Sequence, residues 1–134
     1  EIKSSATYTL RQQVMWPDKP IAFVILDEDK KGRHFGLFKG DALISIVSLF
    51  VKNNHAQFRK LATQSSEQGQ GYGTLLLNHL MTVVLNDELD MIWCNARTDK
   101  ASFYEKFGMA QTPKNFIREG IQYTIMEKVL ISTI

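Results

Sequence analysis

The chain has 134 residues, of which 44% are hydrophobic and 22% charged, and its formal net charge is only +2. This length and composition predict one globular domain over residues 1–134 with a single core. The small charge argues against a nucleic-acid or membrane-surface partner, and no apolar run approaches the ~20 residues of a membrane span. The single cysteine, Cys94, excludes an intrachain disulfide framework. It favours a reducing compartment, and with no signal-peptide pattern at the N-terminus we expect a cytoplasmic protein.

The N-terminal quarter is predicted to be a helix followed by less regular chain. An apolar stripe at helical spacing predicts a helix over residues 5–15, which Ser4 or Ser5 can cap. Two prolines then end the helix, because proline cannot continue it and also restricts the residue before it. The apolar stripe is Leu10, Val14 and Met15, and the helix ends at Trp16–Pro20. A strand or extended segment is expected over 21–26, and a solvated charged loop over 27–32.

Three strands in an antiparallel meander are expected next, each bounded by turn residues. The second is apolar on both faces, which is typical of a central strand. The strands are expected over residues 33–38, 42–51 and 55–63, with turns at 39–41 and 52–54.

The second half of the chain predicts a crossover unit and closing elements. A helix over about 72–85 leads to a short apolar strand over 91–96, so the last strand of the meander, this helix and this strand form a βαβ unit with parallel strands. A second short helix covers 100–107 with Gly108 as its stop, and strand pattern returns at 121–129. We therefore expect an α/β fold with a mixed, mostly antiparallel sheet flanked by helices, built around a central βαβ unit.

The glycine-rich stretch before the longer helix is the strongest sign of a binding site. Gly69, Gly71 and Gly73 alternate just where the helix begins. Glycine lets a backbone approach a ligand closely, and a helix N-terminus offers free N–H groups and a positive dipole end, so this is a phosphate cradle. The alternative is a flexible turn before a core helix. The spacing does not fit a dinucleotide fingerprint, and no lysine completes a P-loop.

Two motifs together resemble one family. Gln68, Gly71 and Gly73 fit the pattern Gln-x-x-Gly-x-Gly, which resembles the acyl-CoA pyrophosphate loop of the GNAT superfamily of N-acetyltransferases. Residues 103–109, Phe-Tyr-Glu-Lys-Phe-Gly-Met, are similar to the family's Leu-Tyr-Glu-Lys-Leu-Gly-Phe segment. With the strand before the loop they span residues 61–109, and the order of the predicted elements extends the resemblance to the whole chain. The expected fold is therefore the GNAT-like acyl-CoA N-acyltransferase fold.

The resemblance implies an enzyme that transfers the acetyl group of acetyl-CoA to a primary amine of an unidentified acceptor, a small molecule or a protein, by direct attack. No metal, nucleic acid or membrane is expected to take part. In the family, CoA lies between two parallel strands that splay apart, here 55–63 and 91–96. Main-chain groups of the first strand hold the thioester and pantetheine, and loop amides bind the pyrophosphate. Carried over, these residues are Leu61, Ala62 and Thr63 on the strand, and Gln68, Gly69, Gln70, Gly71, Tyr72, Gly73 and Thr74 in the loop.

Tyr104 matches the family tyrosine that protonates, or hydrogen-bonds, the leaving CoA sulfur, although a core aromatic is the alternative. The family commonly has an asparagine seven residues before the tyrosine, and Arg97 stands there instead. Asn95, two residues earlier, is the favoured cofactor contact, with Arg97 left open. No general base is evident, although His55 at the start of a strand is in a plausible place. We expect Cys94 to be a buried small residue and not a nucleophile.

Two other functions stay open at this point. A CoA-binding sensor could keep the loop and lose catalysis, since no base is evident, or the loop could belong to a nucleotide-binding or interaction domain of another fold. Glu67 is a further difficulty, because a carboxylate beside the loop would repel phosphate unless it points into water. The sequence leaves open whether the chain is a monomer or a homodimer.

Overall fold

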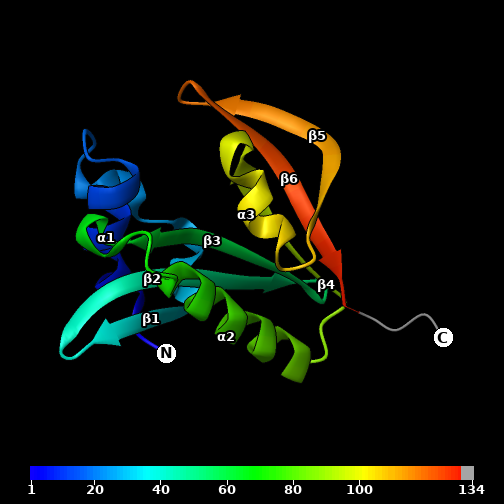
Figure 1. The fold of residues 1–134 in the computed structure, drawn as a ribbon, viewed down its shortest axis with the longest axis horizontal. Helices are drawn as coiled ribbons and strands as arrows, with labels where there is room; N and C mark the ends of the chain where they lie inside the picture. The colour runs from blue at the N-terminus through cyan, green and yellow to red at the C-terminus, as the bar shows by residue number, and fades with distance from the viewer. Residues whose placement is uncertain (131–134) are drawn as a thin grey trace. The chain divides into compact units, whose positions relative to one another are not determined.

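The computed structural model describes residues 1–130, in which six strands are hydrogen-bonded in one sheet (Figure 1). The strands are β1 (Arg33–Lys39), β2 (Ala42–Lys52), β3 (His55–Thr63), β4 (Met91–Arg97), β5 (Ala110–Arg118) and β6 (Ile121–Val129). Their order in the sheet is β1-β2-β3-β4-β6-β5. β1 and β2, β4 and β6, and β5 and β6 pair antiparallel, whereas β3 and β4 pair parallel. The expected mixed, mostly antiparallel sheet with a βαβ crossover is confirmed.

The helices are α1 (Tyr8–Leu10), α2 (Tyr72–Asn86) and α3 (Ala101–Glu105). α1 is the middle of one helical segment, because a 3₁₀ turn precedes it at Ser4–Thr7 and a π turn follows at Arg11–Met15. The helix expected over 5–15 is therefore confirmed. No helix in the described range is long and apolar enough to cross a membrane.

The expected serine cap of the first helix is wrong. The residue before the segment is Lys3, and its side chain makes no capping hydrogen bond. Instead the hydroxyl of Thr7 donates to the carbonyl of Ser4 at 2.6 Å. Ser4 and Ser5 are already inside the first turn, so their hydroxyls are not placed to receive its free N–H groups.

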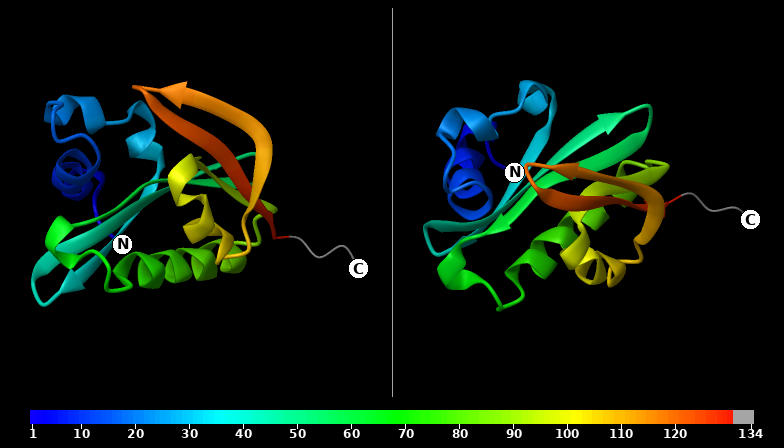
Figure 2. Two further views of the ribbon diagram at one scale, coloured as in Figure 1. Left: turned by 45° about the horizontal axis from the view of Figure 1, so that its top comes forward. Right: turned by 90° about the horizontal axis from the view of Figure 1, so that it is seen from above.

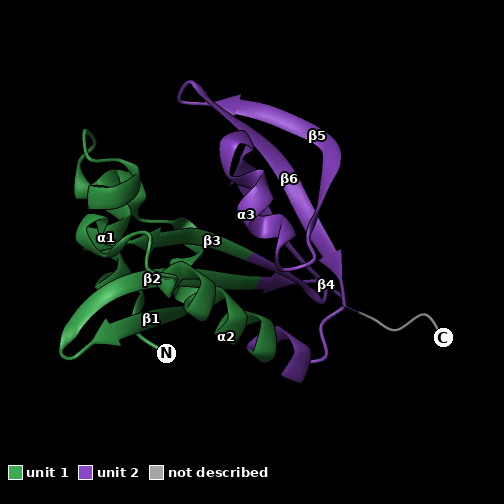
Figure 3. Ribbon diagram, viewed as in Figure 1, with its two compact units in different colours: residues 1–50, 58–82 green, residues 51–57, 83–134 purple. Residues whose placement is uncertain are grey.

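The chain divides into two units (Figure 3). Unit 1 comprises residues 1–50 and 58–82, and unit 2 comprises residues 51–57 and 83–134. The division cuts β2 after Phe50, β3 after Gln57 and α2 after Thr82. The single domain expected over 1–134 stays a prediction, and its last four residues lie outside the described range.

In unit 1 the N-terminal helical turns and α2 lie on opposite faces of β1–β3 (Figure 2). Successive residues of a strand point to opposite faces. His34 accordingly contacts Ser48 and the carbonyl of Asp29, whereas the ring of Phe35 meets His79 of α2 edge-on at 5.8 Å. Both faces of these strands are thus covered, which explains why β2 is apolar on both sides.

The charged run 27–32 is only in part the expected solvated loop, because four of its five charged residues are exposed and the fifth is buried. It contains a 3₁₀ turn, Asp27–Lys31, in which Asp29 is buried. The guanidinium of Arg11, wholly buried, donates to both carboxylate oxygens of Asp29 at 2.8 and 2.9 Å. It also donates to the carbonyl of Val24 and the hydroxyl of Ser48, each at 2.9 Å. Burial alone would raise the pKa of Asp29, but the hydrogen bonds from Arg11 and from a backbone N–H, with the Arg11 charge, lower it.

The apolar run 21–26 is a 3₁₀ turn at Ile21–Val24, so the expected strand or extended segment is wrong there and holds only for Ile25 and Leu26. The turn closes locally, with the N–H of Phe23 donating to the carbonyl of Pro20 at 3.0 Å. Its apolar content is used for packing, because Val24 is fully buried and Phe23 meets Trp16 edge-on at 5.2 Å. Short apolar runs do not distinguish such a turn from a strand.

In unit 2 the elements after β4 differ in part from expectation. β6 is confirmed at its expected bounds, but the sequence did not predict β5 before it. β5 lies at the edge of the sheet and almost all of its residues are exposed, so it lacks the alternating apolar pattern of a half-buried strand. The helix expected over 100–107 is α3 after a 3₁₀ turn at Thr98–Lys100, and Gly108 follows with a φ of +85° as the predicted stop.

Candidate active site

The C-terminal half of β3 has main-chain groups that the ladder with β4 does not use. The two strands pair only from His55 to Gln57, although β3 continues to Thr63. Lys60 interrupts the extended backbone with a φ of +62°. The N–H of Gln64 donates to the carbonyl of Ile44 at 2.8 Å and so points toward β2. Because neighbouring residues in an antiparallel pair point their N–H and C=O groups to opposite sides, those of Thr63 point away from β2.

The three strand residues assigned to the thioester lie in unit 1. Ala62 is buried in a cluster with Leu10 and Ile46, and Leu61 and Thr63 are half-buried. The hydroxyl of Ser45 on β2 donates to the carbonyl of Ala62 at 3.2 Å and lies 2.9 Å from the hydroxyl of Thr63. Ser45 is therefore a neighbour of the site that the sequence did not indicate.

The loop after β3 has a backbone that only glycine adopts readily. Gly69 and Gly71 have φ values of +80° and +82°. At both positions no other part of the protein lies within 4 Å of where a Cβ would be, so the space over the loop is open. The side chain of Gln68 donates to the carbonyl of Thr63 at 3.0 Å and ties the loop to the end of β3. The exposed residues of this loop are Gln68, Gly69, Gln70 and Gly71.

α2 begins directly after the loop. The N–H of Leu75 donates to the carbonyl of Gly71 at 3.1 Å, which is the first helical hydrogen bond. The N–H groups of Tyr72, Gly73 and Thr74 therefore have no acceptor within the helix. The first two of these residues are half-buried, and Thr74 is exposed. With the positive end of the helix dipole, this geometry suits a bound phosphate.

Glu67 is largely shielded from water, whereas exposure to water was the expected way for it to avoid repelling a phosphate. Its side chain is only 18% exposed, and its carboxylate forms an ion pair with the ammonium of Lys39 at 3.3 Å. Lys39 ends β1, 28 residues earlier in the chain. The acidic group beside the loop is therefore neutralised by a cation that the sequence did not connect with it.

Tyr104 lies on α3 in unit 2 and is half-buried. Phe103 meets it edge-on at 5.2 Å and also contacts Phe107 at 5.3 Å. Burial raises the pKa of Tyr104 and the nearby Cys94 adds to the rise, whereas the positive charge of Arg97 opposes it. The phenol is therefore protonated throughout the physiological range.

β4 carries Cys94 and Arg97, which both affect the pKa of this tyrosine, and Asn95 between them. Burial raises the pKa of Cys94 to about 12, so it stays a thiol at neutral pH, as expected of a buried small residue. Asn95 is exposed, and the alternation of the strand points it to the face opposite Cys94. Arg97, not Asn95, is the residue whose charge acts on Tyr104. The cofactor contact assigned to Asn95 stays a prediction.

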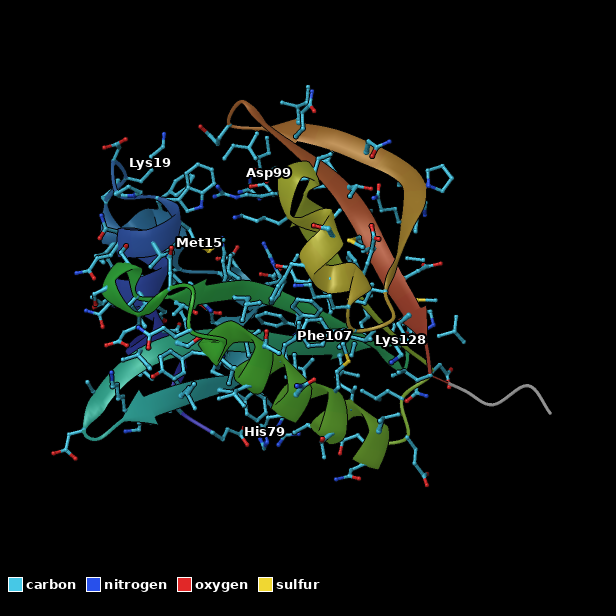
Figure 4. All side chains as sticks on the ribbon, in the orientation of Figure 1. Met15, Lys19, His79, Asp99, Phe107 and Lys128 are labelled. Carbon is cyan, nitrogen blue, oxygen red and sulfur yellow. The ribbon has the colours of Figure 1, made fainter. Side chains whose placement is uncertain are left out.

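The end of α3 is fixed by a lysine from β6. The ammonium of Lys128 donates to the carbonyl of Phe107 at 3.0 Å, and the two residues lie together in Figure 4. A cation at a helix C-terminus satisfies a free carbonyl and complements the dipole. This contact holds the helix that carries Tyr104.

The comparisons with known proteins agree with the motifs. The family model described as an acetyltransferase (GNAT) domain matches residues 10–130. The chain belongs to the GNAT family of acetyltransferases.

Individual GNAT relatives match over nearly the whole chain. The chain is 28% identical to the uncharacterized N-acetyltransferase YitI of Bacillus subtilis (strain 168), covering 92% of this chain and 90% of that protein. It is similar in fold to the ribosomal-protein-S18-alanine N-acetyltransferase of Escherichia coli, with a TM-score of 0.82, 17% identity, and coverage of 97% and 89%. A Bacillus subtilis acetyltransferase in complex with CoA gives a TM-score of 0.75, 17% identity, and coverage of 98% and 95%. The expected GNAT fold and N-acetyltransferase family are thus confirmed.

A GNAT enzyme must remove a proton from its amine, and the histidines do not supply an evident base. His55 is the first residue of β3 and lies in unit 2, whereas Leu61–Thr63 lie in unit 1. A role of His55 as the base stays a prediction. His34 is buried among polar groups, and His79 contacts Phe35. Within residues 1–130 no histidine, cysteine and acidic side chains are grouped to hold a metal ion.

Proposed function

We propose that this GNAT chain transfers the acetyl group of acetyl-CoA to a primary amine by direct attack of the amine nitrogen on the thioester carbonyl carbon. The C–N bond forms and the C–S bond breaks, the amine nitrogen loses a proton to solvent, and the departing CoA thiolate takes up a proton from solvent. No covalent enzyme intermediate is required. The buried Cys94, with its pKa of about 12, is accordingly left without a nucleophilic role.

CoA binding is assigned to main-chain groups of unit 1. The outward N–H and C=O groups at the end of β3 hold the thioester and pantetheine, and the loop with the first turn of α2 binds the pyrophosphate. The observation that carries this proposal is the pair of positive-φ glycines, with open space where side chains would be, at the start of a 15-residue helix. The residues assigned are Leu61, Ala62, Thr63, Gln68, Gly69, Gln70, Gly71, Tyr72, Gly73 and Thr74, with Asn95 as a further contact.

Tyr104 is assigned to the leaving group. Its pKa is raised above the ordinary value, so the hydroxyl is protonated and can donate to the sulfur as negative charge develops there. The same rise makes complete proton transfer less favourable than from an ordinary phenol. We therefore propose that Tyr104 acts mainly as a hydrogen-bond donor to the thiolate.

The acceptor is assigned to the side of the site formed by the N-terminal segment. Val14 and Met15 pack against the cluster that contains Ala62, so this segment adjoins the strand residues assigned to the thioester. The turn Trp16–Pro20 follows directly. We propose that these residues form one wall for an acceptor amine, either a small molecule or a protein amine, in the cytoplasm. A crystal with bound acceptor that lies away from residues 4–20 would contradict this assignment.

A thiol-release assay with a panel of amines, run beside calorimetric titration with CoA, tests the proposed function. The expected result is saturable CoA binding and amine-dependent release of free CoA. Binding without turnover for every amine would favour a CoA-binding sensor. No CoA binding would overturn the assignment of the loop.

A further inference from the structure

The loop proposed to bind pyrophosphate carries an acidic group and no basic one. Between Lys60 and Arg97 the sequence contains neither lysine nor arginine. From Leu61 to Thr74 the only charged side chain is that of Glu67. This carboxylate comes directly before Gln68, where the loop begins, and only 18% of its side chain is exposed. Left alone, it would oppose the binding of a polyanion.

The tip of the β1–β2 hairpin supplies the missing cation. Lys39 is the last residue of β1, and its ammonium lies 3.3 Å from the carboxylate of Glu67. The lysine side chain is 57% exposed, so it keeps contact with solvent. Both residues belong to unit 1, as does the whole loop.

We infer that Lys39 is a positioning residue for CoA that acts through Glu67. It cancels the negative charge beside the loop, and it thereby lets neutral backbone groups bind the pyrophosphate. The inference rests on the proposed function, because it requires that the loop binds CoA. It assigns a role in affinity to a residue far from the loop in sequence.

The expected size of the effect follows from Coulomb's law. A unit charge about 10 Å from a doubly charged pyrophosphate in water changes its binding by roughly fourfold before screening, and salt reduces the effect. An exposed ion pair by itself contributes little to stability. Removing Lys39 should therefore change CoA affinity while leaving the fold intact.

The two residues should act on affinity in opposite directions. Calorimetric titration with CoA at 20 and 300 mM salt would compare the wild type with K39M, E67Q and K39M/E67Q. We expect K39M to weaken binding about two- to fourfold at low salt, E67Q to tighten it by a similar factor, and the double variant to return close to the wild type. K39R should keep the wild-type affinity. The deficit of K39M should shrink at high salt.

Two controls locate the effect. K31M removes the same charge from an exposed lysine just before β1, about 20 Å along the strand from Lys39, and should leave CoA affinity unchanged. Dephospho-CoA keeps the pyrophosphate and lacks the 3′-phosphate, so K39M should weaken its binding by the same ratio. An effect seen with CoA and absent with dephospho-CoA would contradict the inference.

The outcomes separate this inference from the proposed function. If the wild type binds no CoA, the assignment of the loop fails and this inference fails with it. If the wild type binds CoA and both K39M and E67Q weaken binding alike, the ion pair only holds the loop in shape. That result, or K39M binding as tightly as the wild type at low salt, would overturn the inference alone.

Discussion

The two units contribute different parts of the polypeptide to the proposed reaction. In unit 1 the loop offers backbone N–H groups, and its glycines are defined by φ values of +80° and +82°. In unit 2, α3 offers a single hydroxyl, that of Tyr104, whose pKa is raised by burial. A site made of backbone should tolerate most side-chain changes except those at glycine. A site that depends on one hydroxyl should lose its activity when that single oxygen is removed.

The largest expected effect is that of G71V. A β-branched residue at a φ of +82° strains the backbone by about 1–2 kcal/mol, and its side chain would fill the open space over the loop. We expect a folded protein with no measurable CoA binding by calorimetry. The matched control is G120V, at a turn with a φ of +75° and equally open space, which should lose similar stability and keep CoA binding. Wild-type affinity in folded G71V would contradict a pyrophosphate site here.

Y104F is expected to have the next largest effect. It removes one oxygen and keeps the ring that packs against Phe103. Removing one hydrogen-bond donor to a developing anion typically costs about 10²–10³-fold, roughly 3–4 kcal/mol of barrier. Steady-state kinetics should show a large fall in kcat with little change in affinity for acetyl-CoA, because the interaction strengthens in the transition state.

The control for this variant is Y123F, which removes a phenolic oxygen from β6, where the ring stacks on Phe116. Its kcat should match that of the wild type. If kcat of Y104F stays within about threefold of the wild type at equal melting temperature, Tyr104 is a packing residue only.

Alkaline pH should lower the stability of unit 2, because burial keeps both Cys94 and Tyr104 protonated in the folded chain. The pKa of Cys94 is about 12 in the folded chain, above its ordinary value, and that of Tyr104 is also raised. A group whose pKa is raised on folding contributes its full stabilisation below its ordinary pKa. This contribution is lost as the pH rises through the pKa of the folded state. Between pH 9 and 11, urea unfolding should show stability falling by about 1 kcal/mol per pH unit from the thiol. The slope should be shallower in C94A, and equal slopes would contradict the buried thiol.

The smallest effect is expected for Q70A, which tests the tolerance of the loop directly. Gln70 is exposed between the two positive-φ glycines, and its backbone can keep the same shape with alanine. CoA affinity should stay within about twofold of the wild type, because the main chain supplies the contacts. A tenfold loss would mean that the side chain itself binds CoA.

The sequence predicted those parts of the molecule that depend on neighbours in the chain. Local conformational preference and periodicity predicted the turn at the glycines, the helix after it and the bounds of β3 and β6. The motif around Tyr104 is equally local. Its assignment to the leaving group stays a prediction, as do the contacts assigned to the loop.

What the sequence missed depends on partners that are distant in the chain. Asp29 looked like a member of a solvated charged run because its partner, Arg11, is 18 residues away in the N-terminal helical segment. Lys39 and Ser45 join the site only through the register of the hairpin that carries them. β5 was missed because an exposed edge strand carries no periodic apolar signal.

The buried ion pair of Arg11 and Asp29 makes the packing of the N-terminal segment sensitive to acid. The pKa of Asp29 is lowered in the folded chain, so its contribution to stability is present above the ordinary pKa and disappears as pH falls through the folded value. Protonating the carboxyl group would leave the guanidinium of Arg11 buried without its counter-charge, which is strongly unfavourable. In acid, residues 4–15 should therefore release before the strands beneath them. The wall proposed for the acceptor would open while the loop proposed for CoA keeps its shape.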